Sequence, residues 1–473
     1  MTTAVVVGSG PNGLAAAIRL AQQGVRVRVL EARETIGGGT RSGELTLPGL
    51  IHDDCSAFHP TGVASPFLRS LGLEEYGLRW LWSQVELAHP LDSGAAGVLW
   101  RDVDRTAELM PPADGRTWRR VFGRLSSRFD RLAEDVLRPV PHVPGSPLAF
   151  AEFGAQALLP ASWTSRRWSG EQARALFGGA AAHAFSSLRT PFSSAIGLML
   201  IAVGHAHGWP VAQGGSQAIT TAMARLLERL GGTVETGVEV RELDQLDRPD
   251  LVLLDTGPQA AVRILGNRLP HRTARAYRRY RYGPAAFKVD LAVEGGVPWA
   301  DEHCRSAGAV HLGGTFEEVA AAEEATFRGR MPRRPFVLVG QQYLADPSRS
   351  VGDLHPVYAY AHVPHGYRGD ATEPVLDQIE RFAPGFRTRV RARSVRTVAR
   401  MRSDNANHVG GDIVGGANTV RQLVLRPRLA VDPYATGVPG VYLCSAATPP
   451  GAGVHGMAGF HAAESALRWL AKR

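Results

Sequence analysis

The chain has 473 residues, of which 44% are hydrophobic and 21% are charged, so its composition excludes a disordered or fibrous protein. Its formal net charge of +9 would suit an anionic partner, yet the basic residues are scattered along the sequence. The densest run, RTARAYRRYR at 272–281, is typical of a solvated helix face, so we expect no nucleic acid partner. Weak peripheral contact with an anionic membrane stays open.

Cysteine usage and hydropathy exclude further classes. The three cysteines, Cys55, Cys304 and Cys444, are isolated and odd in number, which argues against a disulfide framework and a zinc site. No apolar run reaches the length of a bilayer span, and the first residues lead directly into a strand pattern. We therefore expect a cytoplasmic protein that binds no metal.

The first 31 residues predict a dinucleotide-binding βαβ unit. An apolar strand (AVVVG) is followed by Gly8, Gly10 and Gly13, then by an amphipathic helix and a second strand that ends in Glu31. In this motif the first glycine makes the turn, the second lets a pyrophosphate approach, and the third lets the helix pack on the strand. Glu31 is suited to bind an adenosine ribose and to repel a 2′-phosphate, which disfavours NADP.

The middle of the chain is expected to leave this unit and return to it. A Gly-rich loop at 37–39, followed by Arg41, can wrap a cofactor. From about 73 to 202 the pattern is mostly helical with Pro-rich breaks, which indicates an inserted helical region. Residues 212–255 then contain a turn, a helix and strand patterns, which brings the chain back to the first unit.

The second half predicts another sheet and a final return. Strand patterns at 287–293, 336–343 and 357–363 indicate a mixed sheet in a second domain. A strand (GVYLCSA), a Gly-rich turn and a helix then close the chain between 437 and 472. Too few residues follow this turn for another βαβ unit, so we expect its helix N-terminus to face an anionic or electron-rich group.

Together these features resemble the FAD-dependent superfamily of phytoene desaturases and flavin amine oxidases. The likeness spans nearly the whole chain and includes GSGPNG with Glu31, the GGGTR loop and the C-terminal strand, turn and helix. Stretches such as RYGPAAFKVDLAVEGGVPW and GGDIVGGA are similar to the phytoene dehydrogenase-like branch, which includes pyridine nucleotide-disulfide oxidoreductase domain-containing proteins. This likeness is specific to the branch and not to a substrate.

The resemblance implies an α/β fold in which a Rossmann-type, GR2-like FAD-binding domain is interleaved with an α+β substrate domain. The substrate domain would contain the mixed sheet and the helical insertion. We assign residues 1–75, 205–255 and 401–473 to the FAD-binding domain, and residues 76–204 and 256–400 to the substrate-binding domain.

The resemblance also implies which residues hold FAD. The residues implied for the ADP half are Gly8, Gly10, Gly13, Glu31 and Val240. Those implied for the phosphates, the ribityl chain and the pyrimidine side of the flavin are Gly38, Arg41, Ala446, Gly453, Val454 and Met457. A helix N-terminus at the last of these positions would stabilise the negative charge of the reduced ring.

Lys288 is the first candidate catalytic residue. Of the 53 basic residues only Lys288 and Lys472 are lysines, so a lysine inside an apolar strand suggests a task for a compact amine with an adjustable pKa. Flavin amine oxidases, which the chain resembles, place a lysine at this position that reaches flavin N5 through a water. The alternative is a structural lysine whose side chain is paired or extends to solvent.

The histidines are weaker candidates. His455, in the C-terminal turn, is the best placed of them to accept a proton at the flavin edge. His59, His183, His205 and His207 could also do so, although a lone histidine is more often structural. His205 and His207 have no carboxylate at ligand spacing, which again argues against a metal site.

The favoured function is an FAD-dependent oxidoreductase that desaturates or oxidises an apolar or amphipathic small molecule by hydride transfer to flavin N5. Oxygen, a quinone or another acceptor would then take the electrons. The alternatives are a flavin amine oxidase, a flavin-dependent isomerase and a non-catalytic FAD- or lipid-binding scaffold. The C-terminal turn holds Val454, His455 and Gly456 where amine oxidases have an aromatic residue, which weakens the amine oxidase hypothesis.

Overall fold

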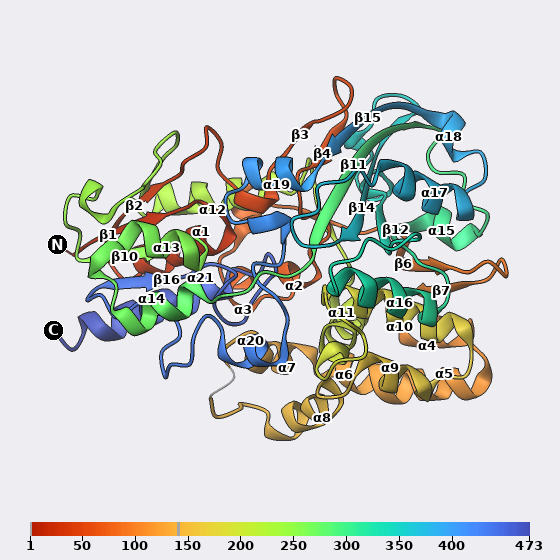
Figure 1. Cartoon of the computed structure of the whole chain (residues 1–473), viewed down its shortest axis with the longest axis horizontal. Coiled ribbons are helices and arrows are strands. Elements are labelled where there is room, and N and C mark those ends of the chain that lie inside the picture. Colours follow the sequence, from red (N-terminus) through yellow and green to blue (C-terminus); the bar gives the residue numbers. More distant parts are fainter. Residues whose placement is uncertain (1, 140–141) are drawn as a thin grey trace.

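The computed structural model describes residues 2–139 and 142–473, and it contains two main sheets with helices packed around them (Figure 1). The first sheet is parallel and has the strand order β16-β10-β1-β2-β9. These strands span Val441–Leu443, Leu251–Leu254, Thr3–Val7, Arg26–Leu30 and Thr233–Glu235. The predicted βαβ unit and the two predicted returns to it therefore form one sheet.

The second sheet is mixed and has the strand order β15-β11-β14-β13-β12-β6-β7. These strands span Val390–Arg396, Ala285–Glu294, Leu354–Val363, Val337–Gly340, Ala307–Leu312, Val85–Pro90 and Ala96–Leu99. Two small antiparallel pairs complete the strands, β3 with β4 and β5 with β8, at Ser42–Glu44, Ile51–Asp53, Trp80–Leu81 and Val211–Ala212. The predicted α/β fold with a Rossmann-type sheet and a separate mixed sheet is confirmed.

Helices cover both faces of the first sheet. One face carries α1, α12 and α21, at Pro11–Ala21, Gln217–Arg229 and Met457–Leu470. The backbones of α1 and α21 touch, because a Cβ added at Gly459 would lie 1.8 Å from the carbonyl oxygen of Asn12. A Cβ at Gly13 would lie 2.1 Å from the Gly8 carbonyl oxygen, so the predicted role of Gly13 in close helix-strand packing is confirmed.

The other face of the first sheet carries α13 (Pro258–Leu265) and α14 (His271–Arg278), whose apolar residues pack against Val7 and Leu254. The arginines of α14 point outward, so the predicted solvated helix face is confirmed. The predicted boundary at residue 255 assigned both helices to the substrate-binding domain. Because they pack on the first sheet, we propose that residues 256–280 belong with the FAD-binding domain.

The helical insertion comprises α4 to α11, which span Val103–Glu108, Pro112–Trp118, Arg124–Ser127, Phe129–Val136, Pro147–Ala157, Ala161–Thr164, Glu171–Ala182 and Ser193–His207. It is shorter than predicted, because β6 and β7 occupy 85–99 and extend the second sheet. All residues of β6 are buried, and its parallel partner β12 lies more than 200 positions away in the sequence. A short buried run of this kind has no strand period, so the pattern alone predicted helix.

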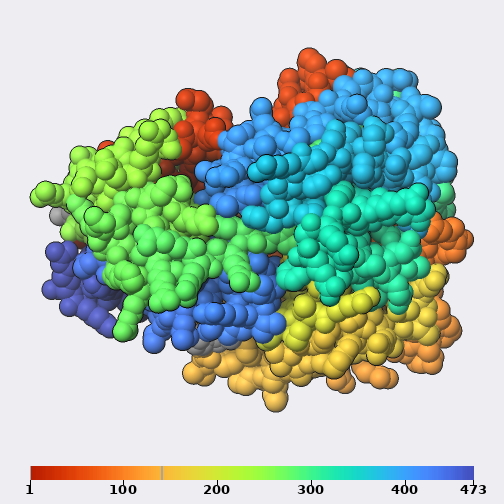
Figure 2. All heavy atoms as spheres, in the orientation of Figure 1, coloured from red at the N-terminus to blue at the C-terminus, as the bar shows by residue number. Residues whose placement is uncertain are grey.

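Further helices surround the second sheet and the loops between the sheets. They are α2, α3 and α15 to α20, at Pro60–Val63, Pro66–Arg69, Glu302–Ser306, Phe316–Phe327, Thr372–Phe382, Phe386–Arg389, Val398–Asp404 and Val420–Leu425. None of the helices in the described ranges is long and apolar enough to cross a membrane. Figure 2 shows early, middle and late segments of the sequence side by side in both halves of the molecule, as an interleaved chain requires.

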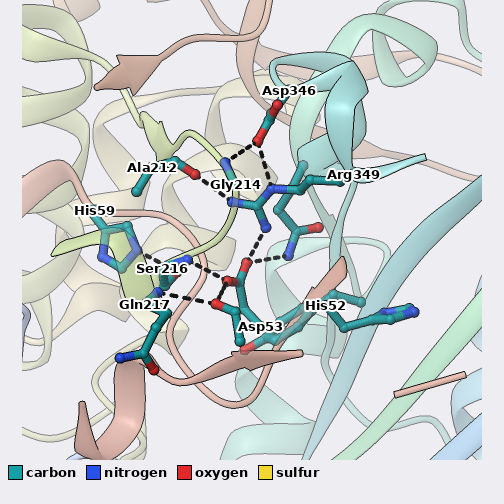
Figure 3. A network of polar contacts seen from close by, with 12 residues as sticks. His52, Asp53, His59, Ala212, Gly214, Ser216, Gln217, Asp346 and Arg349 are labelled. Carbon is teal, nitrogen blue, oxygen red and sulfur yellow. Dashed lines mark hydrogen bonds and ion pairs between the residues drawn. The ribbon is translucent and has the colours of Figure 1, made fainter. Parts of the chain in front are cut away.

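A buried charge network joins the two halves (Figure 3). Arg349, which lies between β13 and β14, donates from Nη1 to Oδ2 of Asp53 at 2.6 Å and from Nε to Oδ2 of Asp346 at 3.2 Å. Asp53, at the end of β4, also accepts from the Ser216 N–H at 2.7 Å, just before α12. Burial opposes ionisation of Asp53, but Arg349 and these donors hold its pKa below the usual value. The network therefore fixes three segments that adjoin both sheets.

Candidate dinucleotide site

A cavity of about 580 Å³ lies at the carboxyl end of the first sheet. Ligands of open α/β sheets bind at this edge, outside the carboxyl ends of the strands. Separate parts of the chain form its wall, including 7–12, 30–33, 38–41, 238–241, 255–257, 404–408 and 445–447. The predicted cofactor residues in this wall are Gly8, Gly10, Glu31, Gly38, Arg41, Val240, Ala446, Gly453 and Val454.

The glycine turn shapes one side of the cavity. Gly8 has φ +105°, a conformation that other residues rarely adopt, and a Cβ at Gly38 would lie 3.2 Å from the Cα of Gly10. Gly10 is the N-cap of α1 and provides no side-chain cap. The N-terminus of α1 and the closely approaching loop thus form a backbone cradle that suits an anionic group.

Glu31 lines the cavity after β2, and its carboxylate is oriented by the protein. Its Oε2 accepts from the backbone N–H of Ser9 at 3.0 Å and from the Ser9 hydroxyl at 2.6 Å. Its Oε1 accepts from the Arg33 N–H at 2.9 Å and from Arg41 Nη2 at 3.2 Å. Arg41 is therefore directed to the acid predicted to bind ribose, and its contact with phosphates stays a prediction.

Three buried polar atoms in the cavity wall have no hydrogen-bond partner among the described residues. They are Asn12 Oδ1, Thr256 Oγ1 and the Tyr282 hydroxyl. Buried polar groups are nearly always paired, so these atoms indicate a polar ligand along the cavity. No sequence motif marks any of the three, although Thr256 follows the end of β10 closely, where ligand contacts concentrate in such folds.

Lys288 is not part of the cavity wall. Its side chain is 1% exposed, forms an ion pair with Asp290, and places Nζ 4.5 Å from the centre of the Tyr358 ring. Tyr358 in turn donates its hydroxyl proton to the backbone of Cys55, which does line the cavity. Burial lowers the pKa of Lys288, and Asp290 opposes this effect. Lys288 is thus separated from the cavity wall at Cys55 by Tyr358, and its catalytic role remains a prediction.

His455 and Met457 also lie outside the cavity wall. His455 accepts the Met457 N–H through Nδ1 at 3.0 Å and so orients the start of α21. Its Nε2 is buried without a partner, and a Cβ at Gly453 would lie 2.7 Å from the imidazole Cδ2. Burial lowers the pKa of His455 to about 4, so the neutral ring supports the turn that lines the cavity.

The other candidate histidines also have partners away from the cavity wall. His205 accepts from Trp118 Nε1 at 3.0 Å and contacts the Arg101 carbonyl oxygen at 3.1 Å, which is a structural arrangement. His59 contacts the Ser216 hydroxyl at 2.8 Å. His207 pairs with Asp130, and His183 with His311. In the part of the chain that the structure describes, no group of three or more ligating side chains is arranged to hold a metal ion.

Buried histidines, among them several of these candidates, should make the free energy of unfolding depend on pH. Burial lowers their pKa from 6.5 to about 3 for His183 and to about 4 for His59, His89, His205, His408, His455 and His461. The unfolded chain takes up protons below pH 6.5 while the folded chain does not. The free energy of unfolding should therefore be highest above pH 6.5 and fall towards pH 4, by up to about 1.4 kcal/mol per pH unit for each histidine. Urea unfolding at pH 5, 6, 7 and 8 measures this, and equal values at pH 5 and 7 would contradict it.

Comparisons with known proteins agree with the fold. An NAD(P)-binding Rossmann-like domain model matches residues 6–71. The chain is 25% identical to the rat (Rattus norvegicus) pyridine nucleotide-disulfide oxidoreductase domain-containing protein 2, over 99% of this chain and 93% of that protein. It is 29% identical to a hydroxyneurosporene desaturase of Cereibacter sphaeroides, over 50% of each chain.

Among solved structures, a putrescine oxidase with bound putrescine is similar in fold, with a TM-score of 0.62. The two are 18% identical, and the likeness covers 99% of each chain. The predicted resemblance to the phytoene dehydrogenase-like branch and to desaturases is confirmed by the two relatives, and the putrescine oxidase shares the fold.

Proposed function

We propose that this chain, a relative of phytoene desaturases and flavin amine oxidases, is an FAD-dependent oxidoreductase that dehydrogenates an apolar or amphipathic small molecule. The observation that carries the proposal is the course of the cavity. The strands whose carboxyl ends form its wall lie side by side in the order β2, β1, β10 and β16, which places Glu31, the glycine turn and Ala446 in that order along it. An adenosine, a diphosphate and a flavin follow one another in the same order along an FAD molecule.

The residues of the cavity fit FAD. Glu31 would accept hydrogen bonds from the ribose, and the N-terminus of α1 with the Gly38 backbone would face the diphosphate. The unpartnered atoms of Asn12, Thr256 and Tyr282 supply further polar contacts. When bound, FAD supplies hydride acceptance at N5, so the protein needs to bind, orient the substrate and exclude water.

An apolar cluster adjoins the cavity at Ile413, and we call this part of the cavity its inner end. Ala57, Phe185, Leu338 and Tyr360 belong to it, and Ile413 packs against it while also lining the cavity. Leu338 and Tyr360 come from β13 and β14 of the second sheet, where they are paired with each other. We propose that the reacting part of the substrate lies here, where apolar side chains keep water away from the C–H bond that breaks.

One observation favours an amine oxidase as the second candidate. Tyr358 and Tyr360 present an aromatic pair near the inner end, with ring centroids 5.7 Å apart and ring planes at 89°. An aromatic pair can position a substrate amine by cation–π attraction. However, the Lys288 ammonium already lies against Tyr358 at 4.5 Å and would repel a protonated amine. An uncharged substrate therefore fits this end better.

Anaerobic mixing of the flavin-loaded protein with candidate substrates separates the hypotheses. A desaturase or oxidase loses its flavin absorbance near 450 nm with its substrate, and we expect apolar or amphipathic alcohols and alkenes to act before diamines. An isomerase converts substrate only after prior reduction of its flavin. A non-catalytic scaffold shows neither response. If neither the apolar or amphipathic compounds nor the diamines lower the flavin absorbance, the proposal is overturned.

Replacing Glu31 by alanine should weaken FAD binding. The variant loses charge-assisted hydrogen bonds to the ribose, which are worth about 1–3 kcal/mol, or roughly five- to 150-fold in Kd. Titration of the flavin-free protein with FAD measures this. Glu34→Ala is the matched control, because Glu34 is an exposed acid three positions later that does not line the cavity. An unchanged Kd for Glu31→Ala would remove Glu31 from the site.

A further inference from the structure

We propose that Asp255 carries a proton when FAD is bound and donates it to the diphosphate, so that FAD binding takes up one proton and weakens as the pH rises. The inference rests on the proposed function, because it assigns a role to this residue toward FAD. Asp255 belongs to no motif recognised in the sequence.

The position of Asp255 is set by the fold. It directly follows β10, its side chain lines the cavity, and the residue is 8% exposed. Its N–H donates to the Val7 carbonyl oxygen at 2.8 Å, and its carbonyl oxygen accepts from Asn407 Nδ2 at 3.0 Å. The backbone is therefore held from two sides, and the carboxyl group has little freedom to leave the turn.

The carboxyl group lies inside the glycine turn that would face the diphosphate. Its Oδ2 accepts the Gly13 N–H at 3.0 Å, and the same oxygen would lie 2.7 Å from a Cβ at Gly10. Gly10 thus leaves room for this acid as well as for a ligand. In the described structure Oδ1 makes no hydrogen bond, so one oxygen remains available to a bound group.

The surroundings of Asp255 provide no paired cation. Glu31 follows β2, which is separated from β10 by β1, and has the same charge sign, and Cys444, after the adjacent β16, is a buried neutral thiol. Arg41 is paired with Glu31, while Arg263 of α13 lines the cavity without an ion pair to Asp255. Burial, opposed by the Gly13 N–H and reinforced by Glu31, raises the pKa of Asp255 to about 7.

This charge arrangement has a direct consequence for binding. A diphosphate carries two negative charges, and an ionised Asp255 would place a third negative charge in the same turn. The protonated acid instead offers an O–H to a phosphate oxygen, and the proton is taken from water without any other bond change. Above the pKa of the free protein, Kd for FAD should rise by up to tenfold for each pH unit, and below it Kd should level off.

The test is FAD titration of the flavin-free protein at pH 6, 7, 8 and 9, with binding heats measured in two buffers of different ionisation enthalpy. The wild type should bind at least tenfold more weakly at pH 9 than at pH 7 and take up close to one proton at pH 8. Asp255→Asn keeps the shape and a hydrogen-bond donor, so it should take up no proton and bind more tightly than wild type at pH 9.

Asp250→Asn is the matched control, because Asp250 precedes the same strand at its opposite end, where it contacts Thr3. It should keep the wild-type pH dependence. A flat pH profile and no proton uptake in the wild type would overturn the proposal even if Asp255→Asn fails to fold, and so would a folded Asp255→Asn with the wild-type slope. Failure of the wild type to bind FAD at any pH would instead reject the proposed function itself.

Discussion

Replacing Arg349 by methionine should lower the free energy of unfolding at pH 7 by about 3–5 kcal/mol, the usual scale for breaking a buried ion pair. Arg349 is fully buried and bridges Asp53 and Asp346, which are also buried. It also donates to the Ala212 carbonyl oxygen at 2.7 Å. The variant removes the only guanidinium from two buried carboxylates that keep just neutral donors such as the Ser216 and Gly214 N–H groups, and this loss exceeds any gain from the apolar side chain.

Urea unfolding of the purified protein measures this effect, and Arg400→Met provides the control. Arg400 also pairs with an aspartate, Asp404, but its side chain is 65% exposed, so its loss should cost less than about 1 kcal/mol. If Arg349→Met loses no more stability than Arg400→Met, the network does not hold the two halves together.

Replacing Lys288 by methionine should slow flavin reduction or reoxidation by roughly tenfold or more if the amine positions a water at N5. The structure adds a second effect, because the variant leaves Asp290 buried without its partner. His52 Nδ1 lies 3.5 Å from Asp290 Oδ1, and the charge of Arg396 also acts on this carboxylate. We therefore expect Lys288→Met to lose stability as well, and the two effects must be separated.

The double variant Lys288→Met, Asp290→Asn separates them, because the neutral amide no longer needs a buried cation. Stopped-flow rates of both half-reactions and melting temperatures are measured for the single and the double variant. A catalytic Lys288 leaves the double variant slow although its stability returns. Wild-type rates in the folded double variant would show that Lys288 is a structural partner of Asp290.

Local patterns predicted the first sheet well. The β1-α1-β2 unit has strict spacing, because glycine turns, helix packing and the ribose acid each require one residue type at one position. The long strands β11 and β14 were also predicted in part, since apolar residues alternate with other side chains at 287–293 and 357–363. In contrast, β6 was predicted as helix, because its burial on both faces comes from β12 and the helical insertion, which are remote in sequence.

Site residues that depend on long-range contacts could not be predicted. Asp255 and Thr256 are candidate site residues only because the fold places them beside the glycine turn, which lies more than 240 positions earlier. Arg349 pairs with Asp53 across 296 positions, and neither residue belongs to a motif. For Lys288 the sequence correctly singled out an unusual buried lysine, but its pairing with Asp290 on the same strand face became visible only in three dimensions.

Chromatographic identification of the cofactor released from the purified protein shows whether the cavity binds FAD. We expect FAD at close to one molecule per chain, either as purified or after reconstitution with excess FAD. Release of FMN alone, or no retained flavin after reconstitution, would contradict it.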